Sequence, residues 1–166
     1  MSVVVGIDLS SRAIDLVRLA ESSGLASHER IDLEQAVGKR ATAWERTLAL
    51  PSLMPPASWW DDVYLVAIEA PYGAGTGTVA VLNRVLGAVA ASLPAPLQRV
   101  ERAWIVRPDE WKGRLGLNRK PSADDIVALG LILDGELAGT QDARDALCVA
   151  FYARELNAQG LASSAA

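Results

Sequence analysis

The chain has 166 residues, of which 51% are hydrophobic, and this length and composition predict a single globular domain with a sizeable core. A single cysteine excludes an internal disulfide framework and is typical of a cytoplasmic protein, and with only one histidine beside it the chain has no zinc-type ligand set. The net charge is −4, and no stretch approaches ~18 uncharged apolar residues, which excludes a membrane span.

The start of the chain predicts three antiparallel strands. Residues 3–9, VVVGIDL, form an almost wholly apolar, β-branched run, which is typical of a buried strand. Residues 13–20 alternate apolar and polar side chains, the turn signal ESSG follows, and a third strand is expected through residues 25–33. Asp15 and His28 are expected on the polar faces of these strands, and neither is assigned a role.

The next segment predicts a helix, a loop and a second buried strand. Residues 40–50 have helical spacing, and the helix is expected to stop at Pro51. A proline-rich loop follows with two adjacent tryptophans, Trp59 and Trp60. Such residues more often cover a core edge or a dimer contact than stack on bases. Residues 63–69, VYLVAIE, form the second fully apolar strand.

A long helix rich in small residues is expected after this strand. It covers residues 75–93, with Thr76 or Thr78 as its N-cap. Its apolar side chains are expected to cover the sheet with one face, and its small residues leave a second face on which a partner could approach closely. The first face consists of Val79, Leu82, Leu86 and Val89, and the small residues are Ala80, Gly87, Ala88 and Ala91.

The last third of the chain predicts one strand and three helical segments. Residues 103–108 form a strand that ends at a proline, and a short helical turn and a basic loop follow. Ser122 is expected to cap a helix over residues 123–135, and Thr140 to cap the last helix, residues 141–156.

The order of elements is therefore βββ-α-β-α-β-α-α. It predicts an α/β fold in which a mixed sheet, with three antiparallel strands and then parallel strands, is flanked by helices. The single domain is expected to span residues 1–158, and residues 159–166 are expected to form a flexible tail.

Four acidic residues lie at positions where an unpaired carboxylate would destabilise the fold. Asp8 lies near the end of the first apolar strand and Glu69 ends the second, and an acid in such a run is costly unless it is paired or binds a metal. Asp142 and Asp145 lie three residues apart on the last helix and therefore point to the same side. Acids in a first helical turn also complement the helix dipole by ~0.3–1 kcal/mol each, so this pair alone does not establish a site.

Positive charge is concentrated in residues 99–120, which carry a net charge of +4 while the remainder of the chain carries −8. Such a stripe can hold phosphates even on an acidic protein, because the local field matters more than the total charge. The alternative is a solvated surface that binds nothing specific. The basic residues of the segment are Arg99, Arg102, Arg107, Lys112, Arg114, Arg119 and Lys120.

Three motifs, GIDLSSRAIDLVRL, VAIEAPYG and QDARDALCVA, occur in this order and in this fold pattern. Together they resemble the RuvC-type Holliday junction resolvases of the RNase H-like superfamily, over residues 3 to about 157. The D-x-x-D-A motif on a helix is the most specific part. The resemblance implies an RNase H-like fold and a crossover junction endodeoxyribonuclease, a structure-selective DNA endonuclease that resolves four-way junctions by paired phosphodiester hydrolysis.

The resemblance also implies roles for individual residues. The acidic metal ligands of the family, which are also its catalytic residues, fall on Asp8, Glu69, Asp142 and Asp145. The residues expected to contact DNA are an aromatic three residues after the second acid and the basic residues around the family's functional lysines, here Tyr72, Lys112, Arg114, Arg119 and Lys120. Packing beneath the following helix is the alternative role for the aromatic residue.

The expected chemistry agrees with these residue types. Carboxylate oxygens favour Mg²⁺, for which Mn²⁺ substitutes. Two such ions ~3.5–4 Å apart activate a water and stabilise the leaving oxygen of a phosphodiester. Without the ions, carboxylates so close together raise one another's pKa. Because a four-way junction is resolved by two cuts related by a two-fold axis, a symmetric homodimer is expected.

The sequence departs from the family pattern in three ways. The usual D-P-G after the first strand reads DLSS, the chain has the insertion SLMPPASWW, and its net charge is acidic. These differences bear on the substrate more than on the chemistry. Two other functions stay open. The first is an actin- or hexokinase-like nucleotide-binding protein, which GIDLSS suggests. The second is a non-catalytic RNase H-like scaffold that binds DNA or a partner.

Overall fold

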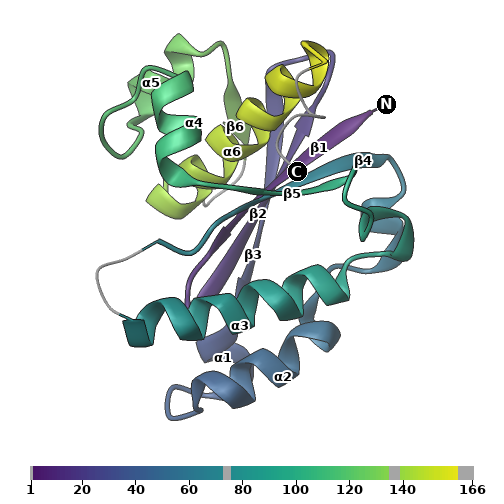
Figure 1. Cartoon of the computed structure of the whole chain (residues 1–166), viewed down its shortest axis with the longest axis vertical. Helices are drawn as coiled ribbons and strands as arrows, with labels where there is room; N and C mark the ends of the chain where they lie inside the picture. The colour runs from purple at the N-terminus through teal and green to yellow at the C-terminus, as the bar shows by residue number, and fades with distance from the viewer. Residues whose placement is uncertain (1, 73–75, 135–138, 161–166) are drawn as a thin grey trace.

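A six-stranded mixed sheet forms the centre of the molecule, and helices cover both of its faces (Figure 1). The computed structural model describes residues 2–72, 76–134 and 139–160. Within the sheet the strands lie in the order β5-β4-β1-β2-β3-β6. The predicted fold class, a mixed sheet flanked by helices, is confirmed.

The three antiparallel strands occur where the sequence predicts them. They are β1 (Val3–Leu9), β2 (Ala13–Ala20) and β3 (Leu25–Asp32), and β2 pairs with both of the others. The third strand ends one residue earlier than expected, because Asp32 caps a short helix, α1 (Leu33–Val37), by accepting a hydrogen bond from the backbone N–H of Gln35.

The parallel part of the sheet lies beside β1. The strand β4 (Val63–Glu69) pairs with β1, and β5 (Ala103–Val106) pairs with β4, both in parallel. Parallel pairing places the carboxyl ends of β1 and β4 at the same end of the sheet, which is where their acids lie. A sixth strand, β6 (Ile132–Asp134), extends the sheet on the far side by pairing in parallel with β3.

The sixth strand corrects the prediction of a helix over residues 123–135. The helix α5 covers only Ala123–Ala128, and residue 135 lies outside the described part of the chain. Gly130 adopts a φ of 69°, a conformation that ends the helix, and the chain then turns onto the open edge of β3. An apolar run beside an unpaired strand edge is stabilised there by backbone hydrogen bonds. The predicted cap Ser122 is confirmed.

The helix predicted to stop at Pro51 passes through this residue. The helix α2 covers Ala43–Leu53, and Thr42 forms a capping box with Glu45 at its start. Because the proline lies in the last turn, it removes a single helical hydrogen bond. The neighbouring Leu50 is 0% exposed and anchors this turn in the core.

The two adjacent tryptophans belong to a 3₁₀ turn, η1 (Ala57–Trp60). Trp60 is buried in the core and donates a hydrogen bond from Nε1 to the carbonyl oxygen of Pro55. Trp59 is half-buried, packs edge-to-face on Trp60 with a centroid separation of 4.6 Å, and carries the guanidinium of Arg18 over its ring. The interpretation that this pair covers a core edge is confirmed.

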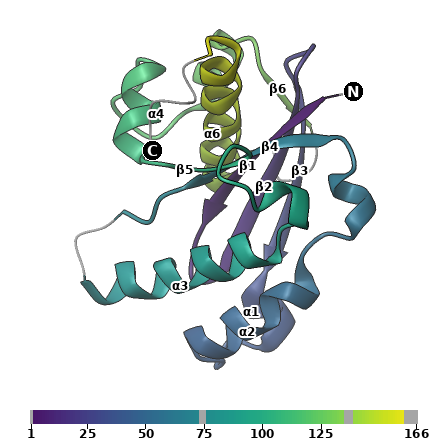
Figure 2. The ribbon, with the colours of Figure 1, turned by 45° about the vertical axis from the view of Figure 1, so that its right-hand side comes forward.

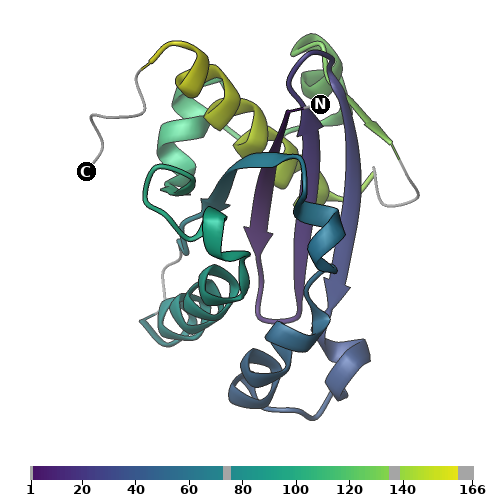
Figure 3. The same cartoon turned by 90° about the vertical axis from the view of Figure 1, so that its right-hand side faces the viewer.

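Two separate layers of side chains hold the helices on the sheet. One face of the sheet is covered by α1, α2 and α3, and the other by α4, α5 and α6 (Figures 2 and 3). Within the described residues, no helix is both long and apolar enough to cross a membrane. The elements not yet given bounds are α3 (Thr76–Ser92), η2 (Ala95–Leu97), α4 (Pro108–Arg114) and α6 (Gln141–Ala158).

The buried face of α3 differs from the predicted one. Val85, Val89 and Leu93 are fully buried, while Leu82 and Leu86 are only partly covered. Relative to the prediction, the helix is therefore rotated so that the side chains at positions 85, 89 and 93, spaced by four residues, face the core. Among the predicted small residues, Ala80, Gly87 and Ala91 are exposed and Ala88 packs on the core.

The ends of the helices α3 and α6 agree with the predictions only in part. The helix α3 begins at Thr76, so neither Thr76 nor Thr78 is its N-cap, and the residue before the helix lies outside the described residues. The predicted cap of α6, Thr140, is confirmed and accepts a hydrogen bond from the N–H of Ala143. This helix runs two residues beyond its predicted end. Most of the predicted tail, residues 161–166, lies outside the described residues.

Candidate active site

The register of the sheet places four charged side chains in one row. Asp8 lies opposite Asp15 across β1 and β2, and Asp15 lies opposite Arg30 across β2 and β3. Glu69 ends β4 next to Asp8, one residue beyond the last pair of these strands. Residues opposite each other in neighbouring strands point to the same face of a sheet, so the whole row faces α6.

The first turns of α6 add two more carboxylates above this row. Asp145 accepts a hydrogen bond from Nε2 of Gln141 at 3.0 Å, and Asp142 forms an ion pair with Arg30. The structure thus brings together all four acids that the sequence singled out. Their roles as metal ligands and catalytic residues stay predictions.

Proximity and burial hold three of these carboxyl groups, those of Asp8, Glu69 and Asp145, away from their ordinary ionisation. Burial, reinforced by the charges of Glu69, Asp145 and Asp142, raises the pKa of Asp8 to about 8. Burial and the charge of Asp145 raise the pKa of Glu69 to about 7, against the lowering effects of two lysines and a hydrogen bond with Asp8. Burial also raises the pKa of Asp145. The cluster therefore lacks the positive charge that its ionised form requires.

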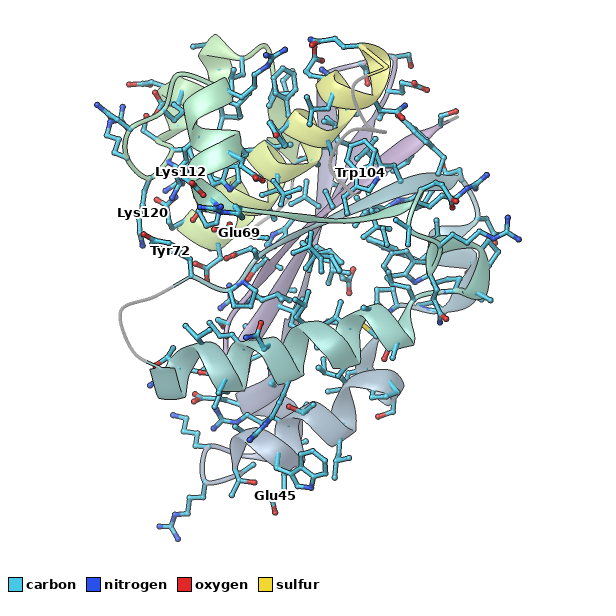
Figure 4. All side chains as sticks on the ribbon, viewed as in Figure 1. Glu45, Glu69, Tyr72, Trp104, Lys112 and Lys120 are labelled. Atoms are coloured by element: carbon cyan, nitrogen blue, oxygen red, sulfur yellow. The ribbon has the colours of Figure 1, made fainter. Side chains whose placement is uncertain are left out.

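Two of the predicted DNA-contacting lysines lie at this cluster. Lys112 and Lys120 both lower the pKa of Glu69 and of Asp145, so their charges act directly on the acids. Figure 4 shows Glu69 and Tyr72 on the same side of the molecule as both lysines, at the left of the view, whereas Trp104 of β5 lies away from them.

Tyr72 stands at the edge of the cluster with its ring in solvent. It is 78% exposed, which excludes the alternative that it packs beneath the following helix. Together with Asp8, Glu69 and Leu82 it lines a cavity of about 150 Å³. The acids are therefore reached from the side on which an exposed aromatic ring is present.

The other basic residues of the stripe differ in their partners and in their place on the sheet. Arg119 pairs with Asp125 at 2.8 Å, and Arg114 donates a hydrogen bond to Gln159. Arg99 and Arg102 precede β5, whereas the acids follow the parallel strands, so these two arginines lie toward the opposite end of the sheet. The predicted contacts of Arg114 and Arg119 with DNA stay predictions.

Sequence analysis missed three charged or polar residues of the site. Asp15 is 2% exposed and the side chain of His28 is 1% exposed, so the expectation that both lie on a polar face was wrong. Arg30 received no assignment at all. A signal was present, because the predicted hairpin between the first two strands places Asp15 opposite Asp8 once its register is drawn.

Comparison with known proteins gives matches in structure alone. No protein-family model and no curated protein sequence matches the chain. In contrast, RuvC from T. thermophilus in complex with a Holliday junction substrate superposes with a TM-score of 0.72, over 97% of this chain and 98% of that chain. The fold is that of the RuvC-type resolvases. The sequence identity of this pair is 18%.

Two further structures have the RuvC-type fold. Thermus thermophilus RuvC alone gives a TM-score of 0.67 at 19% identity, covering 96% of this chain and 97% of that chain. The yeast mitochondrial Holliday junction resolvase Ydc2 gives 0.64 at 13% identity, covering 95% and 81%. At these identities the similarity establishes the fold, and the chemistry must be argued from the site.

The acids at the centre of this RuvC-type fold suit a hard divalent cation in their chemistry. All their donor atoms are carboxylate oxygens, and Oε2 of Glu69 is buried without a hydrogen-bond partner in the described part of the chain. As placed, no three His, Cys, Asp or Glu side chains within residues 2–72, 76–134 and 139–160 could together hold one ion. Mg²⁺ usually keeps several waters and takes only one or two carboxylates, with phosphate oxygens as further ligands. The residues therefore fit Mg²⁺ as partial ligands.

Proposed function

We propose that the protein is a divalent-metal-dependent, structure-selective DNA endonuclease that resolves four-way junctions. The observation that carries this proposal is the buried convergence of Asp8, Glu69 and Asp145 within a RuvC-type fold, in which burial raises all three pKa values and the charge of Asp145 raises those of Asp8 and Glu69 further. Such an arrangement is costly for folding and is explained by a bound cation. A solved structure with this fold contains a Holliday junction substrate, which supports branched DNA as the substrate class.

The carboxylates would share the work of holding Mg²⁺ or Mn²⁺. Asp8 and Glu69, from the ends of two parallel strands, would contribute ligands from the sheet side and Asp142 and Asp145 from the helix side, with waters and phosphate oxygens completing the coordination of each ion. When bound, the cation supplies Lewis acidity toward a phosphate oxygen and lowers the pKa of a bound water. The carboxylates would orient that water by accepting its hydrogen bonds.

Lys112 and Lys120 would hold the phosphates of the DNA next to the acids. Their charges already act on Glu69 and Asp145, so a phosphate bound by them lies beside the carboxylates. Tyr72, which is exposed at the mouth of the cavity, would contact a base or sugar next to the cleaved bond. Tyr72 would position the DNA strand, and the two lysines would neutralise its phosphate charges. Neither contact depends on the base sequence.

A symmetric homodimer would supply the two active sites that paired cleavage requires. Resolution of a four-way junction needs two cuts related by a two-fold axis, and each chain carries one acid cluster. The exposed small residues of α3, Ala80, Gly87 and Ala91, form a surface on which a second helix can approach closely. We place the dimer contact there.

Cleavage of a synthetic four-way junction tests the proposal directly. Each strand is labelled in turn and incubated with the protein and Mg²⁺, with linear duplex of the same sequence as the control substrate. We expect paired nicks in opposite strands of the junction and none in the duplex, and no product with Asp8→Asn. Binding of the junction without any cut, in Mg²⁺ and in Mn²⁺, would favour the non-catalytic scaffold instead.

A further inference from the structure

A buried polar network lies beside the acid cluster, and the proposed chemistry does not use it. The carboxylate of Asp15 is 2% exposed and accepts a hydrogen bond from Nε2 of His28 at 2.7 Å. Nη1 of Arg30 lies 3.1 Å from one oxygen of Asp15 and 3.0 Å from the other. The imidazole is also buried, and its Nδ1 has no partner among the described residues.

The same guanidinium reaches out of the network to the acid cluster. Nη1 of Arg30 lies 3.5 Å from Oδ2 of Asp142, at the start of α6. The two carboxylates differ in their access to water, because the side chain of Asp142 is 41% exposed while Asp15 is buried. The same nitrogen of Arg30, Nη1, thus contacts both the buried Asp15 and the more exposed Asp142, which is one of the four acids.

Packing alone does not explain this arrangement. A buried acid with a histidine and an arginine as partners is no more stable than a well-packed apolar group of the same size. The sheet register aims two of its members at the acids, since Asp15 is opposite Asp8 and Arg30 is opposite Asp15. The register therefore places a guanidinium, held by the buried Asp15, next to Asp142 of the acid cluster.

We propose that Arg30 is a positioning residue of the acid cluster, a built-in counter-charge that pairs with Asp142 in the metal-free protein and gives it up when a divalent cation binds. The inference rests on the proposed function for the cation itself. Asp15 and His28 hold the guanidinium in both states, so that Arg30 exchanges one partner without leaving its place.

The two states place opposite demands on this arginine. In the metal-free protein its charge offsets part of the repulsion among the carboxylates. In the metal-bound protein the same charge lies beside the cation, repels it and must be displaced from Asp142. Removing the charge should therefore destabilise the metal-free protein and strengthen cation binding. The opposite signs distinguish this role from a structural one, which would lower stability equally in both states.

Arg30→Gln, compared with the wild type and with Arg12→Gln, tests these signs. The control removes the same charge from an arginine that pairs with Glu34 and does not contact the acids. Melting temperatures are measured in EDTA and with Mn²⁺, and Mn²⁺ binding is measured by calorimetry. We expect a lower melting temperature in EDTA, a larger rise with Mn²⁺ and a roughly three- to tenfold lower Kd for Mn²⁺ in Arg30→Gln alone.

The route through Asp142 is tested in a second background. In Asp142→Asn, adding Arg30→Gln should lower the Kd for Mn²⁺ by less than it does in the wild type, because the shared partner is already lost and only the direct repulsion is removed. A second measurement on the intact residue covers the case that Arg30→Gln does not fold. The guanidinium NMR signal of Arg30, assigned by its loss in Arg30→Lys, should shift when Mg²⁺ is added to the wild type and stay in place in Asp142→Asn.

The outcomes separate this proposal from the proposed function. If the wild type shows no response to Mn²⁺ in heat or in melting temperature, the metal-dependent function fails and the role of Arg30 fails with it. If the wild type responds but Arg30→Gln binds Mn²⁺ with the same or lower affinity, or the guanidinium signal is insensitive to Mg²⁺, only the role of Arg30 is overturned.

Discussion

A β-carbon on Gly6 would lie 1.9 Å from the carbonyl oxygen of Ala146. This contact seats α6 directly on the backbone of β1. Asp8 follows Gly6 by two residues on the same face of the strand, and Asp145 precedes Ala146 on the helix. The separation between the strand acids and the helix acids is therefore set by the absence of a side chain at one position.

We expect Gly6→Ala to destabilise the protein and to disperse the acid cluster. The new methyl group meets backbone atoms, which cannot move aside as a flexible side chain can, so α6 must shift. Overpacking of this kind costs about 1–3 kcal/mol, occasionally more. Urea unfolding measures the change. Gly77→Ala is the matched control, because nothing lies within 4 Å of its β-carbon position, and a stability loss of similar size there would contradict the explanation.

We expect Asp145→Asn to abolish cleavage while junction binding survives. The substitution keeps the shape of the side chain and removes its charge, so a ligand of the proposed cation is lost. Because that charge raises the pKa of Asp8 and of Glu69, its removal should also raise the melting temperature in metal-free buffer. Junction cleavage, gel-shift binding and thermal melting in EDTA measure the three effects. Asp109→Asn, at an exposed acid paired with Arg107, should change none of them. Near-normal cleavage by Asp145→Asn would refute the site.

Stability in metal-free buffer should fall as the pH rises from about 4 to about 8. The pKa of Asp8 is 3.8 in its ordinary state and about 8 in the folded protein, so over this range the folded state binds more protons than the unfolded state. Glu69, at about 7 against 4.5, acts in the same sense. Asp125, whose pKa is lowered to about 2 by its capping hydrogen bonds with Ser122, adds stability that is lost only on acidification.

Thermal melting in EDTA between pH 5 and pH 8 measures this dependence. We expect the melting temperature to drop by on the order of 5 °C or more as the acids ionise. Added Mg²⁺ should flatten the curve, since a cation stabilises the ionised carboxylates. A melting temperature that rises toward pH 8 in EDTA would contradict the raised pKa values.

The periodicity of the sequence predicted most of the fold but misplaced one face of the sheet. Alternation in residues 13–20 identified β2 correctly and suggested that its polar side chains meet water. The strand instead lies in the middle of the sheet, where α6 covers the side that carries Asp15. His28 is buried on the same face of the sheet, where its Nε2 bonds to Asp15. A single strand's pattern contains no information about its neighbours.

The two strand acids were found for the opposite reason, whereas Asp142 and Asp145 were found by their spacing on a helix and by the D-x-x-D-A motif. Asp8 and Glu69 interrupt runs that are apolar on both faces, and this conflict is visible within a single strand. Arg30 lies in a polar stretch of β3, where an arginine conflicts with nothing. Its importance comes from the register that places it opposite Asp15. A charged residue in an apolar run can thus be recognised from the sequence alone. The partner that neutralises it can be identified only once the register of the sheet is known.

We expect Lys112→Ala and Lys120→Ala to weaken junction binding on every sequence alike. Both lysines lie beside the acids, where they would contact phosphates, and each lost phosphate contact should reduce the salt dependence of binding by about one unit of slope. Fluorescence anisotropy at several salt concentrations measures this slope. Arg99→Ala, toward the far end of the sheet, is the matched control and should keep the wild-type slope. Unchanged slopes in both lysine variants would assign these lysines to the solvated surface.

We expect Gly87→Glu to convert a dimer into a folded monomer. The position is exposed on α3 and nothing lies within 4 Å of its β-carbon position, so one chain accommodates a glutamate, which also favours helix more than glycine does. At a close helix–helix contact the same side chain would bring two buried charges together. Sedimentation at micromolar concentration should show a dimer for the wild type and for Gly77→Glu, which is equally open, and a monomer for Gly87→Glu. Since paired cleavage requires two sites, the monomer should cut junctions in single, uncoordinated nicks. A wild type that stays monomeric with junction DNA bound would refute the dimer and leave a nuclease that makes one nick at a time.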